Sequence, residues 1–395
     1  MQKDPIVIVG MARTPMGGFM GELADATGPE LGTVAIKGAL EYAGVKPDDV
    51  QEVIMGCVLQ HGQRQGPARQ AAINAGIPMS AGATTINKLC GSGMKATMLA
   101  HDLLAAGTND VMVAGGFESM TNIPYMLPKG RGGMRMGHGE IYDAMFWDGL
   151  EDAYDRGKLM GHFAENTAQK YQFTRDQQDE FAIRSLERAK KANEDGSFKG
   201  EMVPITVKGR KGEKTVERDE QPFTANIEKI PSLRPAFSKD GTVTPANSSS
   251  ISDGGAALVL MRRSEAERRG LTPLATIIAH TTHSQEPQWF TTAPVGALRK
   301  LYEKTGWTPE EVELYEINEA FAVVTMAAMK EFNLPADKVN IHGGACALGH
   351  PVGASGARII ATLINAMRKH DLKKGVATLC IGGGEATAMA IERHH

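Results

Sequence analysis

The sequence predicts an α/β fold in which short strands and helices alternate along most of the chain. Short apolar, β-branched runs recur, and each is followed by a segment whose apolar residues have helical spacing. This alternation begins at the N-terminus and starts again near residue 271. With 395 residues, 42% of them hydrophobic, the chain can bury a large core. Strands that alternate with helices favour mostly parallel sheets packed between helices.

The first alternating region ends near residue 120, and a segment of different composition follows it. The elements expected in the first region are strands at 5–10, 52–58 and 110–116 and helices at 31–42, ending near Gly44, and at 90–106. From about 120 to 248, Gly, Met and Arg become dense, as in PKGRGGMRMGHGE. An amphipathic helix is expected there near 174–194, and a polar hairpin-like stretch at 203–217. The segment is therefore interpreted as an insertion into the α/β core.

The buried-strand pattern returns at residue 251. The elements expected from there on are strands at 251–261, 274–280, 312–317, 375–381 and 386–392 and helices at 294–304, 319–332 and 355–369. ISDGGAALVLM and CIGGGEATAMAIE both run from a Gly-rich turn into an apolar strand, and CGSGMKA and GHPVGASGAR are both small-residue turns before a helix. These similarities indicate a duplicated unit of about 130 residues. Two unrelated halves with the common α/β pattern would share such turns as well.

Charge and cysteine content exclude several classes of protein. The 43 Lys and Arg against 46 Asp and Glu give a net charge of −3, which offers no general attraction to nucleic acid or an anionic membrane. The N-terminus lacks a signal-peptide pattern and no apolar stretch is long enough to span a bilayer, so a cytoplasmic location is expected. Four cysteines without C-x-x-C spacing predict reduced thiols and no metal site. His394 and His395 resemble the remnant of an expression tag.

Cys90 is the first candidate for chemistry, in the segment NKLCGSGMKA. The adjoining glycines allow a tight turn and close approach of a ligand. A helix that starts directly after Cys90 would point its free N–H groups toward the sulfur, which predicts a lowered thiol pKa. Taken alone, such a cysteine is more often a small buried residue.

His350 is the second candidate, in a window rich in glycine, HGGACALGHPVGASGAR. A histidine directly before a Pro-Val-Gly turn and a helix can act as a base for a nearby thiol. A structural histidine, or a zinc pair with Cys346, would be the alternatives, and no second ligand pair has suitable spacing. A dinucleotide-binding loop is disfavoured because the G-x-G-x-x-G pattern is absent.

Two strand ends supply the remaining candidates. Cys380 ends a strand that runs into three glycines beginning with Gly382, and such a turn exposes backbone N–H groups suited to an anionic oxygen. Asn318, in EINEAFA, lies at a junction between a strand and a helix. Judged alone, Asn318 is as plausible a helix cap as a catalytic amide.

Together, the segments NKLCGSGMKA, VAGGFESM, NEAF, GGACALGHPVGASGAR and TLCIGGG closely resemble the thiolase family, in order and separation, across nearly the whole chain. The resemblance implies two similar five-stranded α/β/α halves that form a five-layered core with an inserted loop domain. The implied divisions are 1–120 plus 249–270 for the N-terminal half, 121–248 for the loop domain and 271–395 for the C-terminal half. It also implies a homotetramer, a dimer of dimers, assembled partly through the insertion.

The resemblance further implies the activity of the biosynthetic members, the reversible condensation of two acetyl-CoA to acetoacetyl-CoA and CoA. Cys90 would carry the acyl group, His350 would activate it, and Cys380 would move the proton of the α-carbon. Asn318 would hold a water in an oxyanion hole, and the N–H groups of Cys90 and Gly382 would form a second one. No metal or redox cofactor is implied, because CoA supplies the thioester as part of the substrate.

Contacts to CoA are also implied by the resemblance, at Ser249, Met160, Leu159, Phe237 and Phe321. Ordinary packing would explain the two phenylalanines equally well.

Three positions depart from the common pattern of the family. Leu159 replaces a usual His before Met-Gly, His342 replaces a usual Asn before Gly-Gly, and Cys346 replaces a common aliphatic residue. These departures concern the ligand contacts and the preference for chain length.

Three other functions compete with short-chain condensation. A degradative 3-ketoacyl-CoA thiolase of fatty-acid β-oxidation would use the same catalytic residues. A ketoacyl synthase would be expected to use Cys-His-His, where this chain has two Cys, one His and one Asn. A non-catalytic CoA- or lipid-binding protein would be favoured by loss of Cys90, His350 or Cys380, and all three are present.

Overall fold

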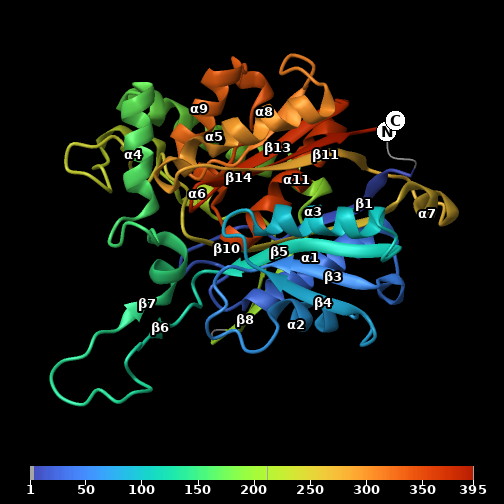
Figure 1. The fold of residues 1–395 in the computed structure, drawn as a ribbon, viewed down its shortest axis with the longest axis horizontal. Helices are drawn as coiled ribbons and strands as arrows, with labels where there is room; N and C mark the ends of the chain where they lie inside the picture. The colour runs from blue at the N-terminus through green and yellow to red at the C-terminus, as the bar shows by residue number, and fades with distance from the viewer. Residues whose placement is uncertain (1–3, 211, 395) are drawn as a thin grey trace.

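A computed structural model describes residues 4–210 and 212–394, and its main feature is a ten-stranded mixed sheet (Figure 1). The strands of this sheet are β1 (Ile6–Arg13), β2 (Gly17–Gly18), β3 (Glu52–Gly56), β4 (Gly82–Ile86), β5 (Val111–Ser119), β10 (Ser252–Arg262), β11 (Ala275–Ser284), β12 (Leu314–Ile317), β13 (Lys374–Ile381) and β14 (Glu385–Glu392). Their order is β12-β13-β14-β11-β1-β10-β5-β3-β4, with β2 paired to β10. Two small hairpins are formed by β6 (Tyr125–Met126) with β7 (Tyr142–Asp143) and by β8 (Ile205–Gly209) with β9 (Gly212–Val216).

The helices cover both faces of this sheet. They are α1 (Gly28–Ala43), α2 (Pro67–Asn74), α3 (Ser92–Ala105), α4 (Met160–Tyr171), α5 (Arg175–Glu194), α6 (Gln221–Thr224), α7 (Arg263–Arg268), α8 (Ala293–Thr305), α9 (Ala322–Phe332), α10 (Ala345–Leu348) and α11 (Val352–Lys369). Shorter helical turns lie at Pro47–Asp49, Phe146–Leu150, Ser197–Gly200, Ile227–Ser232, Pro287–Thr292 and Ala336–Lys338. None of the helices in the described ranges is long and apolar enough to cross a membrane.

Local signals set the ends of the better predicted helices. A capping box between Thr27 and Glu30 starts α1, and Gly44 ends it with a φ of 66°. The helix therefore stops where the sequence predicts. A second capping box, between Thr174 and Gln177, starts α5 in the same way.

The expectation of mostly parallel strands was wrong. Only β3 with its neighbours β4 and β5, and β12 with β13, pair in parallel in the described ladders, whereas β1, β10, β11 and β14 pair antiparallel with their neighbours. A strand buried on both faces carries the same apolar run in either direction, so the sequence pattern does not encode direction. The tight glycine turn between β13 and β14 makes that pair a hairpin.

The sheet is divided into two similar halves, which supports the predicted duplication. The first half has the order β4-β3-β5-β10-β1, and the second repeats it as β12-β13-β14-β11. The resemblance implies a fifth strand in the second half, which would pair with the outer edge of β12. In its place there is only a parallel bridge between Tyr315 and Val339, so the second half has four full strands. Only two residue pairs link β1 to β11, which lets the halves fold toward each other.

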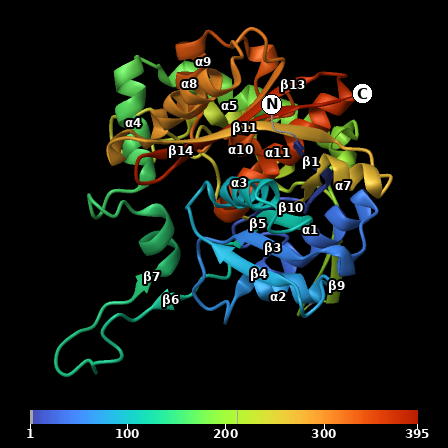
Figure 2. The ribbon, with the colours of Figure 1, turned by 45° about the vertical axis from the view of Figure 1, so that its right-hand side comes forward.

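The two halves enclose α3 and α11 and so form five layers (Figures 1 and 2). One apolar cluster packs α1 and α2 on the first half, a central cluster packs α3 and α11 between both halves, and a third packs α8 on the second half. The five-layered core implied by the resemblance is therefore confirmed.

Glycines allow α3 and α11 to approach closely. A Cβ atom on Gly356 would lie 2.2 Å from the backbone N of Met94, and one on Gly93 would lie 2.8 Å from that of Ala357. These contacts join the first turns of the two helices. The segments that precede the helices, which contain Cys90 and His350, are thereby brought together.

The inserted segment forms α4, α5 and two hairpins. The hairpin between β6 and β7 reaches away from the body of the molecule in both ribbon views (Figures 1 and 2). Helix α5 and the hairpin β8–β9 match the predicted elements, with residue 211 of the latter hairpin outside the described residues. Helix α4 was not predicted. The divisions proposed at 120, 248 and 270 stay a prediction.

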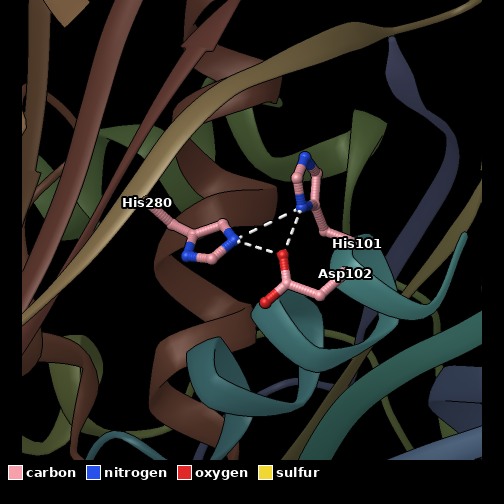
Figure 3. A group of neighbouring side chains, drawn as sticks. All are labelled: His101, Asp102 and His280. Atoms are coloured by element: carbon pink, nitrogen blue, oxygen red, sulfur yellow. Dashed lines mark hydrogen bonds and ion pairs between the residues drawn. The ribbon is translucent and has the colours of Figure 1, made fainter. Parts of the chain in front are cut away.

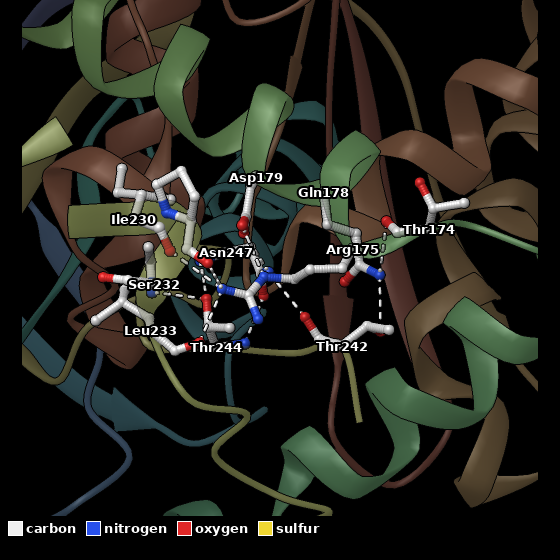
Figure 4. Close-up of polar contacts among 12 residues, drawn as sticks. Thr174, Arg175, Gln178, Asp179, Ile230, Ser232, Leu233, Thr242, Thr244 and Asn247 are labelled. Carbon is white, nitrogen blue, oxygen red and sulfur yellow. Dashed lines mark hydrogen bonds and ion pairs between the residues drawn. The ribbon is translucent and has the colours of Figure 1, made fainter. Parts of the chain in front are cut away.

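A polar network around Arg175 fixes the last part of the insertion on α5 (Figure 4). Arg175 pairs with Asp179 at 2.7 Å and donates to the carbonyls of Ile230 and Leu233. Asp179 in turn accepts from the Asn247 amide at 3.2 Å, and the backbone O of Asn247 accepts from the start of α9. The network therefore positions residues 248–250, which follow directly.

Candidate active site

A cavity of about 360 Å³ lies where the two halves meet the insertion. Cys90, His350 and Gly382 contribute to its wall. The wall also includes all five predicted CoA contacts, which are Leu159, Met160, Phe237, Ser249 and Phe321. The structure thus gathers eight of the ten predicted residues around one space, from segments that are far apart in the sequence. Cys380 and Asn318 are buried and do not line it.

A second, outer cavity of about 700 Å³ adjoins this space. Both cavities include Leu89, Met160 and Gly382 in their walls. The rim of the outer cavity carries Arg156 and Glu385, and Glu385 pairs with Lys88 at 2.7 Å. A long ligand can therefore extend from the inner cavity toward the protein surface.

Cys90 lies in a strained turn between β4 and α3. Leu89 has a φ of 46°, a left-handed conformation that a leucine adopts only at a cost of about 1–2 kcal/mol. Ser92 closes the turn, because its hydroxyl donates to the Leu89 carbonyl at 2.7 Å and accepts from Lys88 N at 2.8 Å. The backbone N–H groups of Gly382 and of Cys90 itself point at the Cys90 sulfur. The predicted helix start is confirmed, with α3 beginning two residues after the cysteine.

The predicted lowering of the Cys90 pKa was wrong. Burial raises the pKa of the Cys90 thiol to about 11, and the hydrogen bonds from Gly382 and from its own N–H offset only part of this rise. The nearby carboxylate of Glu118 raises it further. The helix start stabilises a thiolate, but loss of water around the sulfur outweighs that effect. The resting group is therefore a protonated thiol that needs a base.

His350 has the properties of that base. Its Nδ1 hydrogen-bonds to Ser355 Oγ at 2.5 Å, and Ser355 itself donates to the Pro351 carbonyl at 3.0 Å. Nδ1 therefore carries the ring proton. Nε2 is buried, with no hydrogen-bond partner among the described residues. Burial, helped by the positive Arg358, lowers the pKa of His350 to about 3, so the imidazole is neutral and Nε2 is free to accept a proton.

Cys380 lies near the end of β13, opposite Ala386 of β14. Burial raises the pKa of the Cys380 thiol well above its ordinary value, and a negative charge on Cys90 raises it further. The two sulfurs thus affect each other's protonation. The turn that follows contains Gly383 and Gly384 with φ values of 84° and 93°. Such φ values favour glycine. Gly382, which precedes them, lines the cavity and directs its N–H at the Cys90 sulfur.

Asn318 follows β12, and its backbone N donates to the carbonyl of Thr378 at 3.0 Å, two residues before Cys380. The helix α9 starts later and has Phe321 as its cap, so the alternative role of Asn318 as a helix cap was wrong. Both polar atoms of the Asn318 side chain are buried without a hydrogen-bond partner among the described residues. A buried amide without hydrogen-bond partners in this place is available to a ligand or a water.

Glu118 supports the site but was given no role from the sequence, although it lies in the quoted segment VAGGFESM. Its carboxylate accepts from the backbone N–H groups of Val58, Leu59 and Gly353 at 2.9–3.0 Å. Burial raises the pKa of Glu118 to about 7, and these three donors counteract the rise. The Glu118 side chain thus joins β5 to the first turn of α11, the helix that begins two residues after His350. Only the fold shows this link, because the three donors are distant in sequence.

The three departures from the family pattern take different places. Leu159 lines the cavity at the N-terminus of α4, and its backbone N hydrogen-bonds to His162 Nδ1 at 3.1 Å. His342 is absent from the cavity wall and packs against Phe198 with ring centroids 5.8 Å apart. Cys346 is also absent from the wall, and its N–H donates to Glu319 at 3.2 Å. Of the three, only Leu159 is placed to touch a ligand.

Comparison with known proteins identifies the same family in both halves. Residues 6–264 match the model described as "Thiolase, N-terminal domain", and residues 271–393 match "Thiolase, C-terminal domain". A Cupriavidus necator protein named acetyl-CoA acetyltransferase is 48% identical over 390 residues, which cover 98% of this chain and 99% of the relative. A Gibberella zeae protein named as a cytosolic acetyl-CoA acetyltransferase is 45% identical, with 98% of each chain covered.

A solved structure is also similar throughout. The crystal structure of the Bacillus anthracis acetyl-CoA acetyltransferase superposes with a TM-score of 0.96 and 42% sequence identity, and 99% of each chain is covered. The similarity therefore includes the insertion as well as the two halves.

Proposed function

The chain belongs to the thiolase family, and we propose on this basis that it is an enzyme that condenses two acetyl-CoA to acetoacetyl-CoA and CoA through an acyl group on Cys90. The observation that carries the proposal is the meeting of Cys90, His350 and Gly382 in one cavity. The names of the full-length relatives support acetyl-CoA as the substrate. The reverse reaction, thiolysis of acetoacetyl-CoA, uses the same site because an enzyme does not change an equilibrium.

The first half-reaction forms the acyl-enzyme. Nε2 of neutral His350 takes the proton of the Cys90 thiol as the sulfur attacks the acetyl carbonyl. The C–S bond to CoA then breaks, and CoA leaves as a thiol with the proton of Cys380. Because Cys90 and His350 are both neutral at rest, the proton moves together with the attack and no stable ion pair precedes it.

The second half-reaction forms the carbon–carbon bond. The Cys380 thiolate removes a proton from the methyl carbon of a second acetyl-CoA, and the resulting enolate attacks the acetyl group on Cys90. The C–S bond to Cys90 breaks, and Cys90 recovers its proton from His350. Each thiol and the imidazole thus return to their starting protonation, and the products are acetoacetyl-CoA and CoA.

Two oxyanion sites would stabilise the charge that develops on oxygen. The N–H groups of Cys90 and Gly382 point at the Cys90 sulfur, which supports a role for them in binding the oxyanion of the tetrahedral intermediate formed there. The protonated His350 and a water held by the Asn318 amide would stabilise the enolate. The unpaired amide of Asn318 and the unpaired Nε2 of His350 support this second site.

The proposed enzyme needs no cofactor besides the CoA of its substrates, because the thioester already acidifies the α-carbon and provides the leaving group. Ser249 would contact the pantetheine, with Met160, Leu159, Phe237 and Phe321 packed around it. Phe237 approaches α4 closely, since a Cβ atom on Gly161 would lie 2.2 Å from its ring. The names of the full-length relatives support a short acyl chain in this place.

The assembly and location are proposed from the same resemblance. A homotetramer would use the hairpin between β6 and β7, where Met136 is 97% exposed and Leu127, Met134 and Ile141 are exposed as well. Four exposed apolar side chains on one projecting segment suit contact with a second copy. The cytosolic relative supports a cytoplasmic location. We expect neither nucleic acid nor membrane as a partner.

The experiment that tests the proposal compares thiolysis of acetoacetyl-CoA with thiolysis of 3-ketoacyl-CoA substrates of increasing chain length. We expect the highest kcat/KM for acetoacetyl-CoA and no activity in Cys90→Ala. Faster cleavage of long chains would assign the protein to the degradative class instead. An inactive, correctly folded wild-type protein that still binds CoA would support a non-catalytic role.

A further inference from the structure

Three side chains outside the active-site cavity converge on one point (Figure 3). His101 and Asp102 are on α3, and His280 is on β11. Asp102 Oδ1 lies 2.9 Å from His101 Nδ1 and 3.0 Å from His280 Nε2, and the two nitrogens are 3.3 Å apart. Among the described residues, this is the one group of three His, Cys, Asp or Glu side chains whose ligand atoms are this close together.

The dimensions of this group fit a small divalent ion. Ligand atoms of a tetrahedral zinc site at about 2.0–2.1 Å from the metal are roughly 3.3 Å from one another. The observed separations of 2.9–3.3 Å need only a small expansion to reach that value. Figure 3 shows both ring nitrogens and the carboxylate oxygen pointing into the same space.

The chemistry of the group also fits an ion of this class. Two imidazole nitrogens and one carboxylate oxygen are donors that zinc accepts, whereas magnesium and calcium prefer oxygen alone. Without a metal, the three side chains would form a hydrogen-bonded His–Asp–His cluster in which the ring nitrogens that face Asp102 carry protons. To bind a metal, each ring would move this proton to its other nitrogen.

Access to the site is one-sided. The side chains of His101 and His280 are 8% and 12% exposed, whereas that of Asp102 is 57% exposed. Metal ions can therefore enter past Asp102. The fourth coordination position would face solvent and hold a water.

We propose that His101, Asp102 and His280 form a binding site for a zinc-class divalent ion that joins the two halves of the molecule. Helix α3 belongs to the first half and β11 to the second, and the ligands are 179 residues apart in sequence. No short-range spacing of ligands along the chain therefore marks the site, and no metal site was expected. None of the three residues lines the active-site cavity, so the ion has no part in the thioester chemistry. Because it binds only the folded arrangement, the ion stabilises the fold.

The test is a titration of chelator-treated, full-length protein with zinc chloride, followed by measurement of the bound zinc per chain. Thiols also bind zinc, so the result is the difference between variants. We expect wild type to bind one more zinc per chain than His280→Gln or Asp102→Asn, or to bind it with an affinity higher by about a hundredfold or more. Magnesium chloride should give no binding of this kind.

His283→Gln is the matched control, because His283 lies on the same strand outside the cluster and hydrogen-bonds to Gln285. It should bind as much zinc as wild type. Zinc should raise the melting temperature of wild type and His283→Gln by several degrees and leave His280→Gln unchanged. Retained thiolysis activity shows that each variant is folded. Equal zinc binding and equal melting temperatures in wild type, His280→Gln and Asp102→Asn would overturn the proposal.

Discussion

At the scale of single residues, the site is defined by polar atoms that the protein itself leaves without partners. The Asn318 amide and His350 Nε2 are buried and unpaired among the described residues. Leaving such a group unpaired costs about 1–3 kcal/mol of stability. Asn340, by contrast, has both polar atoms of its side chain paired. The unpaired atoms of Asn318 and His350 are therefore available to a ligand or a water.

This contrast predicts opposite effects for two asparagines. Asn318→Ala removes no hydrogen bond within the protein, so kcat should fall by about a hundred- to a thousandfold while the unfolding free energy stays within about 1 kcal/mol. Asn340 donates to the Ile317 carbonyl and to Glu319 and accepts from Ile317 N, each at 2.8 Å. Asn340→Ala should therefore destabilise the protein by about 2–4 kcal/mol.

Steady-state kinetics and urea unfolding of both variants measure these effects. Strong destabilisation by Asn318→Ala together with normal kcat would show that its amide is structural.

The protonation states of Cys90 and His350 predict how alkylation depends on pH. Burial raises the pKa of Cys90 to about 11 and lowers that of His350 to about 3, so thiol and imidazole are both neutral between these values. Because iodoacetamide reacts with the thiolate, the alkylation rate of the free enzyme should rise about tenfold per pH unit from pH 6 to 9, without a plateau.

Mass spectrometry of the modified peptide restricts the measurement to Cys90, and Cys90→Ala serves as the blank. A plateau below pH 7 would mean that a thiolate–imidazolium pair exists at rest.

At the scale of elements, the site depends on the contact between α3 and α11. Each helix starts just after a catalytic candidate, and their first turns meet at Gly93 and Gly356. The central apolar cluster then fixes the remainder of both helices between the two halves of the sheet. A small shift of either helix would separate Cys90 from His350.

We therefore predict that Gly356→Ala harms both stability and activity. A Cβ atom there would lie 2.2 Å from Met94 N, so the helices must separate, at a cost of about 1–3 kcal/mol or more. At Gly82, in β4, the nearest atom to such a Cβ is 3.5 Å away, and Gly82→Ala should change stability by less than about 0.5 kcal/mol. Thermal unfolding and thiolysis rates of the two variants check this. Equal behaviour would contradict the proposed role of the helix contact.

Most elements were predictable because their signals are local. The capping box of α1, its terminal Gly44 and the apolar runs of β5 and β10 all belong to short stretches of sequence. Strand direction was not predictable, since a doubly buried strand has no directional pattern. Helix α4 was missed because its N-cap is Leu159, whose side chain has no oxygen to accept a hydrogen bond, so no local signal marks its start.

The candidate residues of the site were predicted from their turns and from the resemblance, but their protonation states were not. The elevated pKa of Cys90 results from burial by parts of the chain that are remote in sequence. The role of Glu118 was not predictable either, because the three N–H groups that donate to its carboxylate are distant along the chain. The resemblance thus predicts which residues take part in the reaction, whereas tertiary packing sets their proton affinities.

At the scale of the whole molecule, the cavity is a junction of three parts. Cys90 comes from the first half of the chain, His350 and Gly382 come from the second, and Met160 and Phe237 come from the insertion. Neither half alone can therefore assemble the site. The proposed metal ion would strengthen the same junction from the other end of α3.

The projecting hairpin predicts how the subunits assemble. Replacing Met134 and Met136 together with Ser removes apolar surface that is exposed in the single chain, and it should shift the proposed tetramer toward dimers. Met79→Ser is the control, because Met79 is also 71% exposed but belongs to the segment between α2 and β4 in the first half. Light scattering coupled to gel filtration measures the masses. An unchanged mass for the double variant would exclude the hairpin as an assembly surface.

The central claim is that Cys90 carries the acyl group while Cys380 moves the proton on carbon. It is tested most directly by mass spectrometry of peptides from Cys380→Ala after incubation with acetyl-CoA. Free CoA from added acetyl-CoA is measured in the same samples, with Cys90→Ala as the control. We predict that Cys380→Ala carries one acetyl group, on Cys90, and makes no acetoacetyl-CoA, and that Cys90→Ala carries none. Acetoacetyl-CoA formation by Cys380→Ala, or an acetyl group on Cys380 of the wild type, would contradict this division of roles.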